Sequence, residues 1–196
     1  MHYRWPVVFL LIMFAGVSLA FTGIDRKTSP PPPADDATPF DVMMSVVTHK
    51  RCMNCHPSGD RPRQGEDSHL HNFNVQRGPD NHGVKGLQCA TCHQKENNEY
   101  SGVPGAPHWG LAPLSMAWEG LSRTEIARSF LSRENNGGKS LEETVKHMTE
   151  DELVLWAFTP GVDDEGNMRE VPPASEAAFV AAVKAWAAAG AVVPEK

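Results

Sequence analysis

The stretch from residue 52 to residue 93 begins and ends with the same five-residue pattern, Cys52-Met53-Asn54-Cys55-His56 and Cys89-Ala90-Thr91-Cys92-His93. Two thiols at this spacing, followed directly by a histidine, are typical of covalent haem attachment. The thiols bond to the macrocycle, and the imidazole binds its iron. The sequence therefore predicts two covalently attached c-type haems. The expected attachment residues are Cys52, Cys55, Cys89 and Cys92, and the expected proximal ligands are His56 and His93.

Two C-x-x-C pairs are also compatible with a structural zinc ion or with disulfides. A zinc site does not need a histidine directly after each pair, whereas a haem iron needs that residue as a ligand. The chain has four cysteines, all of them in the two motifs. No thiol therefore remains for nucleophilic catalysis.

The composition limits the class of partner. The chain has 196 residues, 40% of them hydrophobic, and a formal net charge of −6. This acidic balance argues against a nucleic-acid partner. A redox partner that is guided by electrostatic attraction should present a basic patch.

The N-terminal segment, residues 1–23, has the pattern of an export signal. Arg4 precedes an apolar run over residues 7–21, and small residues end at Ala20. Cleavage after Ala20 would release the protein. An uncleaved run would instead anchor it in the membrane, with Arg4 on the cytoplasmic side. Residues 24–38 contain four consecutive prolines and predict a stiff linker. Residues 39–196 then form the haem domain, which is expected in the periplasm, either soluble or N-terminally membrane-anchored.

The haem domain is expected to be all-α, with short helices and long haem-covering loops. A first helix is predicted over residues 39–51, with an apolar face, and a second over residues 86–97. Between them, residues 57–86 are rich in Gly, Pro, Asp and Asn, which predicts little regular structure. Four helix starts are indicated further on by capping residues, namely Ser122, Ser140, Thr149 and Ser175, the first three with glutamate three residues later.

Further histidines are needed as distal ligands. We prefer His71, which Phe73 follows closely, and His108, which lies between Pro107 and Trp109. His49 and His147 are the alternates. His49 would share a helix face with the first motif and could then reach only the second haem. The remaining candidates are expected to be solvated loop residues, His69 and His82, or core methionines, Met116 and Met148.

Four segments of the chain resemble a family of small exported dihaem c-type cytochromes, often labelled cytochrome components of isoquinoline 1-oxidoreductase. The segments are residues 49–57 (HKRCMNCHP), 71–78 (HNFNVQRG), 105–113 (GAPHWGLAP) and 115–121 (SMAWEGL). The resemblance extends from Val46 to Val193. It implies a periplasmic electron carrier that serves a molybdenum hydroxylase acting on N-heterocycles or aldehydes.

The expected function is electron transfer from a dehydrogenase or oxidoreductase partner to a downstream acceptor, without catalysis by the chain itself. The chain offers haem attachment sites but no evident acid and base groups around an open iron. Two alternatives remain, a dihaem peroxidase and a haem-based sensor, each of which keeps one iron site open.

Overall fold

The structure is a computed structural model and describes residues 37–195. The expected signal or anchor over residues 1–23, and nearly all of the linker over residues 24–38, lie outside the described residues. Within the part that is described, no helix combines the length and the apolar character needed to cross a membrane.

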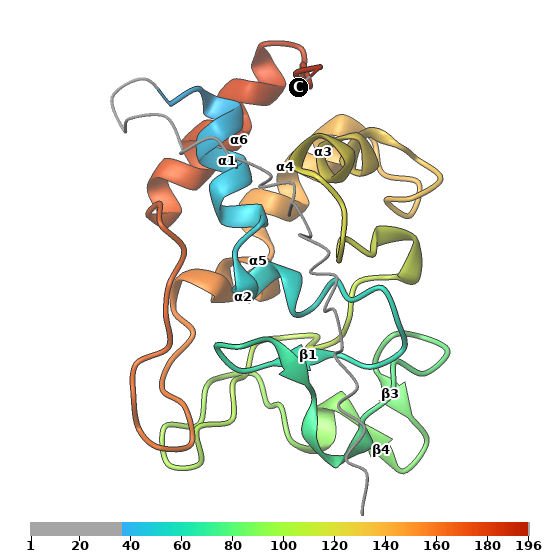
Figure 1. The fold of residues 1–196 in the computed structure, drawn as a ribbon, viewed down its shortest axis with the longest axis vertical. Coiled ribbons are helices and arrows are strands. Elements are labelled where there is room, and N and C mark those ends of the chain that lie inside the picture. Colours follow the sequence, from blue (N-terminus) through green and yellow to red (C-terminus); the bar gives the residue numbers. More distant parts are fainter. Residues whose placement is uncertain (1–36, 196) are drawn as a thin grey trace, which may run out of the picture. The chain divides into compact units, whose positions relative to one another are not determined.

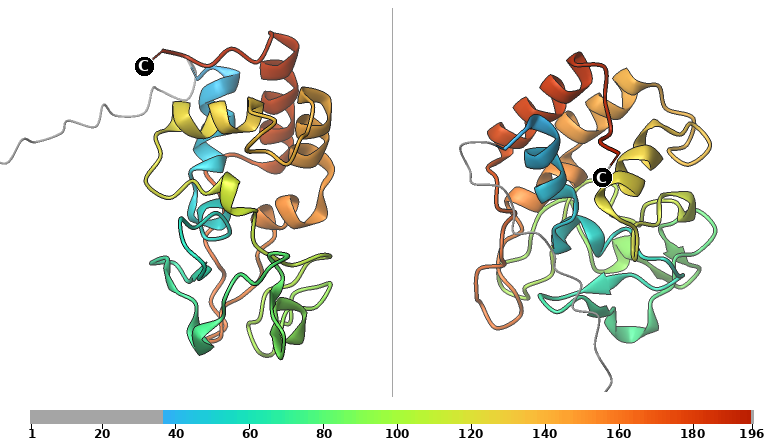
Figure 2. Two further views of the ribbon diagram at one scale, coloured as in Figure 1. Left: turned by 90° about the vertical axis from the view of Figure 1, so that its right-hand side faces the viewer. Right: turned by 45° about the horizontal axis from the view of Figure 1, so that its top comes forward.

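The regular structure is mainly helical (Figure 1). The α-helices within residues 37–195 are α1 (Pro39–Val47), α2 (Lys50–Met53), α3 (Arg123–Leu131), α4 (Leu141–Glu150), α5 (Glu152–Leu155) and α6 (Glu176–Ala188). Helices α1, α3, α4 and α6 gather at one end of this part of the chain (Figures 1 and 2). The segment between α2 and α3 forms the opposite end and carries the second motif.

The helix starts follow local capping chemistry. Ser122 and Ser140 each form a reciprocal capping box with the glutamate three residues later, and Ser175 caps α6, as predicted. Thr38 forms a further box with Asp41 at the start of α1. Each cap satisfies backbone N–H groups that the first turn of a helix leaves without partners.

Helix α6 packs against both α1 and α4, and the core lies between these helices. Met43, Met44 and Val46 of α1 are buried there with Ile126 of α3 and Val183 of α6. The predicted apolar face of the first helix is therefore confirmed, and α3 and α6 each bury one face against it. Burial of these faces positions α2, which follows α1 after two residues and carries the first cysteine.

The segment between α2 and α3 has only short regular elements. Strands β1 (Arg63–Gln64) and β2 (His69–Leu70) form one antiparallel hairpin, and β3 (Gly83–Val84) and β4 (Leu87–Gln88) form another. Its 3₁₀ turns are η2 (Asn72–Asn74), η3 (Cys89–Thr91) and η4 (Leu114–Met116), and η5 (Trp156–Phe158) follows α5.

A buried arginine connects three of these loops. The Arg77 guanidinium donates hydrogen bonds to the carbonyl oxygens of Pro57 (3.3 Å), Gly59 (3.0 Å) and Ala112, and Arg77 is only 6% exposed. The bonded carbonyls lie 18 to 35 residues away from it in sequence. The hydrogen bonds of Arg77 therefore hold together loop segments that are distant in sequence and that no strand pairing connects.

Three predicted elements are wrong in detail. The helix expected over residues 39–51 is interrupted, because His49 adopts an extended backbone and its ring accepts a hydrogen bond from the Arg51 N–H as the N-cap of α2. Thr149 lies inside α4 and does not start a helix, and Asp151 caps α5 instead. The helix expected over residues 86–97 is replaced by β4 and the single turn η3, after Gly86 with φ +90°.

Candidate cofactor sites

The first motif begins on α2 and ends in the turn that follows it. The His56 Nδ1–H donates to the carbonyl oxygen of Met116 at 2.7 Å, because a carbonyl can only accept. The ring also stacks on Trp118, with 3.3 Å between ring centroids and 10° between ring planes. Within residues 37–195, Nε2 of His56 takes part in no hydrogen bond. This arrangement fixes the ring orientation and the tautomer that leaves Nε2 free for a metal.

A cavity of about 260 Å³ adjoins the first motif. Its wall includes Cys52, Cys55 and His56, together with the following apolar or aromatic residues: Val47, Leu111, Met116, Trp118, Phe130, Met148, Leu153, Val154, Trp156 and Phe179. Both thiols are free. An apolar cavity next to two thiols and an oriented imidazole fits a covalently bound haem.

Burial keeps the groups of the first motif neutral. It raises the pKa of Cys52 to about 12 and that of Cys55 to about 11. It also lowers the pKa of His56 to about 3, so the imidazole is neutral at pH 7. A neutral imidazole is the form that binds a metal.

Two polar atoms in the cavity wall support the same interpretation. The Trp118 Nε1 and the Thr144 Oγ1 are buried, and neither has a hydrogen-bond partner among the described residues. Buried donors normally find acceptors. The propionate groups of a haem would provide acceptors here.

The second motif has the same hydrogen-bond arrangement on a different local structure. Its first three residues form η3, and the His93 Nδ1–H donates to the carbonyl oxygen of Pro104 at 2.7 Å. The His93 ring stacks on Trp109, with 4.6 Å between centroids and 6° between planes. Burial lowers the pKa of His93. Both motif histidines therefore use a distant backbone carbonyl to keep Nε2 available.

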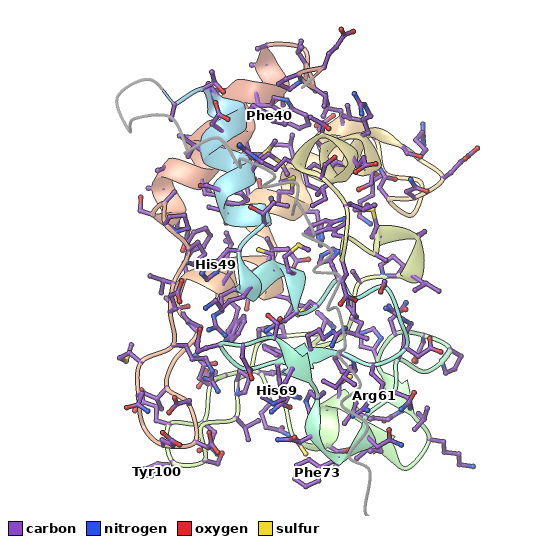
Figure 3. All side chains as sticks on the ribbon, in the orientation of Figure 1. Phe40, His49, Arg61, His69, Phe73 and Tyr100 are labelled. Atoms are coloured by element: carbon purple, nitrogen blue, oxygen red, sulfur yellow. The ribbon has the colours of Figure 1, made fainter. Side chains whose placement is uncertain are left out.

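His71, one of the two preferred distal ligands, lies close to the second motif. Its ring centroid is 6.0 Å from that of His93, at an interplanar angle of 69°. Its Nδ1–H donates to the carbonyl oxygen of Asn72 at 2.8 Å, so Nε2 is again the free nitrogen. Phe73, whose position close to His71 in sequence favoured that histidine, points outward and is 85% exposed (Figure 3).

His49, an alternate distal ligand, is engaged through both ring nitrogens. Its Nδ1 accepts from the Arg51 N–H at 3.3 Å, and its Nε2 lies 3.2 Å from Glu170 Oε1. The interrupted helix also removes the face shared with the first motif, which was the reason for expecting His49 to reach only the second haem. His49 therefore has a structural role at the start of α2 (Figure 3).

His108, His147 and His82 all line the cavity of the first motif. His108 is exposed and has a left-handed backbone, with φ +57°. His147, near the end of α4, has its Nδ1 at 3.0 Å from Asp151 Oδ2. His82 donates from Nδ1 to the carbonyl oxygen of Asp80 at 2.7 Å. The other loop histidine, His69, is exposed and pairs with Asp67 at 2.5 Å.

Two tryptophans connect the surroundings of the motifs. Trp109, stacked on His93, meets Trp156 edge to face at 4.9 Å between centroids, and Trp156 lines the first cavity. The amide oxygen of Asn97 accepts from Trp156 Nε1 at 2.8 Å and from the Gly105 N–H at 3.0 Å. Asn97 therefore holds Trp156 and the loop that carries the Pro104 carbonyl.

Several residues at these sites were not identified from the sequence, namely Trp118, Asp151, Asn97 and the carbonyl groups of Met116 and Pro104. Of these, only Asp151 could have been found from the sequence, because it lies four residues after His147 and side chains at that spacing are neighbours on a helix. The carbonyl groups have no side-chain signature.

A structural zinc ion, the alternative to haem, is held by four ligands in a tetrahedral arrangement. Within residues 37–195, no group of three or more His, Cys, Asp or Glu side chains is placed to hold a metal ion.

The chain was compared with known proteins. It matches no protein-family model, no curated protein and no solved structure.

Proposed function

We propose that this protein is a small, all-α dihaem c-type cytochrome that carries electrons and is not itself an enzyme. The observation that carries the proposal is the repeated geometry of the motif histidines. In both C-x-x-C-H pentads, Nδ1 is bonded to a backbone carbonyl at 2.7 Å and Nε2 is left for iron. Two haems attached through these motifs would supply one-electron redox chemistry. The chain holds each haem through thiols, orients the proximal imidazole and lines the first site with apolar side chains.

The position of a second histidine favours a carrier over a peroxidase or sensor. A carrier uses two axial ligands, whereas the alternatives need one open iron site. His71 lies near His93, and three further histidines share the cavity with His56. Each proximal histidine therefore has candidate partners close by.

We further propose that the carrier acts in the periplasm, soluble or held by its N-terminus. It would take electrons from an exported dehydrogenase or oxidoreductase and pass them to a downstream acceptor. A molybdenum hydroxylase is the donor that the sequence resemblance implies. The net charge of −6 favours a partner with a basic docking patch.

The haem content tests this proposal. The full chain, produced in a bacterial host that attaches c-type haem, is expected to carry two haems in intact-mass analysis. The Cys52→Ala/Cys55→Ala variant should retain one, since the second motif is separate. Pyridine haemochrome absorbance provides an independent count. The Ser58→Ala variant, which alters an exposed residue near the first motif, should keep two. A native chain without added haem mass would reject the proposed function.

Replacement of His71 by alanine is expected to open an iron site at the second motif. The reason is that the His71 ring lies 6.0 Å from that of His93, between ring centroids, while the bond from Nδ1 to the Asn72 carbonyl leaves Nε2 free. Electron paramagnetic resonance should change from a low-spin to a high-spin signal for one haem of two. His69→Ala is the matched control, because His69 is exposed and paired with Asp67. Equal spectra for both variants would exclude His71 as a ligand.

A further inference from the structure

His147, in the cavity of the first motif, is held through Nδ1 as the motif histidines are, but its partner is a carboxylate and not a backbone carbonyl. His147 stands in the last turn of α4 and lines the cavity together with His56 and both thiols. Its Nδ1 lies 3.0 Å from Asp151 Oδ2. An ionised carboxylate only accepts hydrogen bonds, so Nδ1 carries the proton and Nε2 has the free lone pair.

The position of Asp151 is set by the junction of two helices. Asp151 ends α4 and caps α5, where its Oδ1 accepts from the Leu153 N–H at 2.9 Å. Its Oδ2 is then directed at His147, four residues earlier. One carboxylate thus starts α5 and fixes the ring of His147.

The other candidates in this cavity are less well arranged for binding iron. His108 and His147 are both exposed, but within residues 37–195 no hydrogen bond holds either ring nitrogen of His108, whereas Asp151 holds Nδ1 of His147. The Nε2 edge of His82 faces the backbone of Gly110, where an added Cβ would lie 3.1 Å from Nε2. The Met116 carbonyl accepts the hydrogen bond from His56, so Met116 lies on the proximal side of this site. Met148 is 7% exposed and belongs to the core cluster.

We propose that His147 is the second axial ligand of the haem at the first motif, and that Asp151 is a positioning residue that lowers the reduction potential of this haem. The inference rests on the proposed function. A histidine ligand that donates to a carboxylate is a stronger electron donor than one that donates to a neutral carbonyl, and it therefore favours oxidised iron. His56, His71 and His93 donate to the carbonyl oxygens of Met116, Asn72 and Pro104. Among these candidate ligands only His147 is bonded to a carboxylate, so the two haems are chemically unequal.

The ligand is tested by spectroscopy of the haem-loaded full chain. His147→Ala should convert one haem from low-spin to high-spin and allow ferrous carbon monoxide binding at that haem. His147→Met keeps a side chain of similar length and a possible ligand. It should stay low-spin, gain a methionine–iron absorption band and show a higher potential for one haem. Two bound haems with unchanged spectra in His147→Ala, or a His147→Met spectrum without the sulfur band, would overturn the assignment to His147.

The role of Asp151 is tested by potentiometric titration. Asp151→Asn retains a good helix cap but loses the anionic acceptor, and Asp151→Ser retains the cap without a second oxygen. Both should remain low-spin, and both should raise the potential of one haem while the other is unchanged. Glu152→Gln removes the same charge from an adjacent exposed residue and should give a much smaller shift. Equal shifts in potential for Asp151→Asn and Glu152→Gln would mean that only the loss of a nearby negative charge matters, and they would reject a positioning role for Asp151.

These results are separable from a failure of the proposed function. A native chain that carries no haem would contradict the function itself. A native chain with two haems, whose spectra and potentials do not respond to changes at His147 and Asp151, would contradict only this inference.

Discussion

Replacement of Arg77 by methionine is expected to lower the free energy of unfolding by about 4 kcal/mol. The methionine side chain fills much of the same volume but leaves the carbonyl oxygens of Pro57, Gly59 and Ala112 without their donor. Buried acceptors without a partner each cost about 1–3 kcal/mol, and partial access of water to the loops reduces the sum. The loss should appear as a lower midpoint in urea unfolding followed by circular dichroism.

The matched control for Arg77 is Arg123→Met, which removes the same charge from a helix surface. The side chain of Arg123 is 42% exposed and pairs with Asp41 at 3.0 Å, so its loss should cost less than about 1 kcal/mol. Arg77→Lys should fall between the two, because one ammonium group cannot reproduce the branched donor geometry of a guanidinium. Equal losses for Arg77→Met and Arg123→Met would show that the buried hydrogen bonds of Arg77 contribute nothing beyond charge.

Replacement of Gly105 by alanine is expected to disrupt the second motif and to cost about 3 kcal/mol of stability. A Cβ at this position would lie 2.1 Å from the carbonyl oxygen of Glu96 and 2.6 Å from that of Gln94, so the backbone has to move. The preceding residue, Pro104, provides the carbonyl that binds His93. We therefore expect a high-spin signal from one haem, or attachment of one haem instead of two, together with a lower unfolding midpoint.

Gly59→Ala is the control for Gly105. Apart from its chain neighbours, no atom of residues 37–195 lies within 4 Å of a Cβ placed there, and the residue is exposed, so the variant should keep native stability and two low-spin haems. A Gly105→Ala protein that matches this control in unfolding midpoint and in spectra would contradict the close packing described for the Pro104–Gly105 loop.

Features that depend on neighbouring residues could be predicted without the structure. Ser122, Ser140 and Ser175 start helices because their hydroxyl groups accept from N–H groups three residues later, an interaction that is complete within one turn. The apolar spacing in α1 similarly determined which face of that helix is buried. The two C-x-x-C-H pentads identified the candidate cofactor sites by chemistry alone.

The predictions failed where two local preferences compete. Residues 39–51 have helical periodicity throughout, but the His49 ring can cap a new helix by accepting from the Arg51 N–H, and the chain breaks there. The second motif was expected on a helix by analogy with the first, yet the β3–β4 hairpin directly precedes it and leaves only one 3₁₀ turn. Local spacing does not determine which preference prevails, because both conformations satisfy the backbone.

The tertiary structure alone decided which histidines can face each motif. His56 receives its orientation from a carbonyl 60 residues later, and His93 from one 11 residues later. Every residue, proline included, has a backbone carbonyl, so no residue type marks these partners in advance. His49 and His147 were equal alternates in the sequence, and the fold separated them. Both ring nitrogens of His49 are engaged, one with Arg51 and the other with Glu170. His147 instead lines the cavity of the first motif, with Nδ1 bound to Asp151 and Nε2 free.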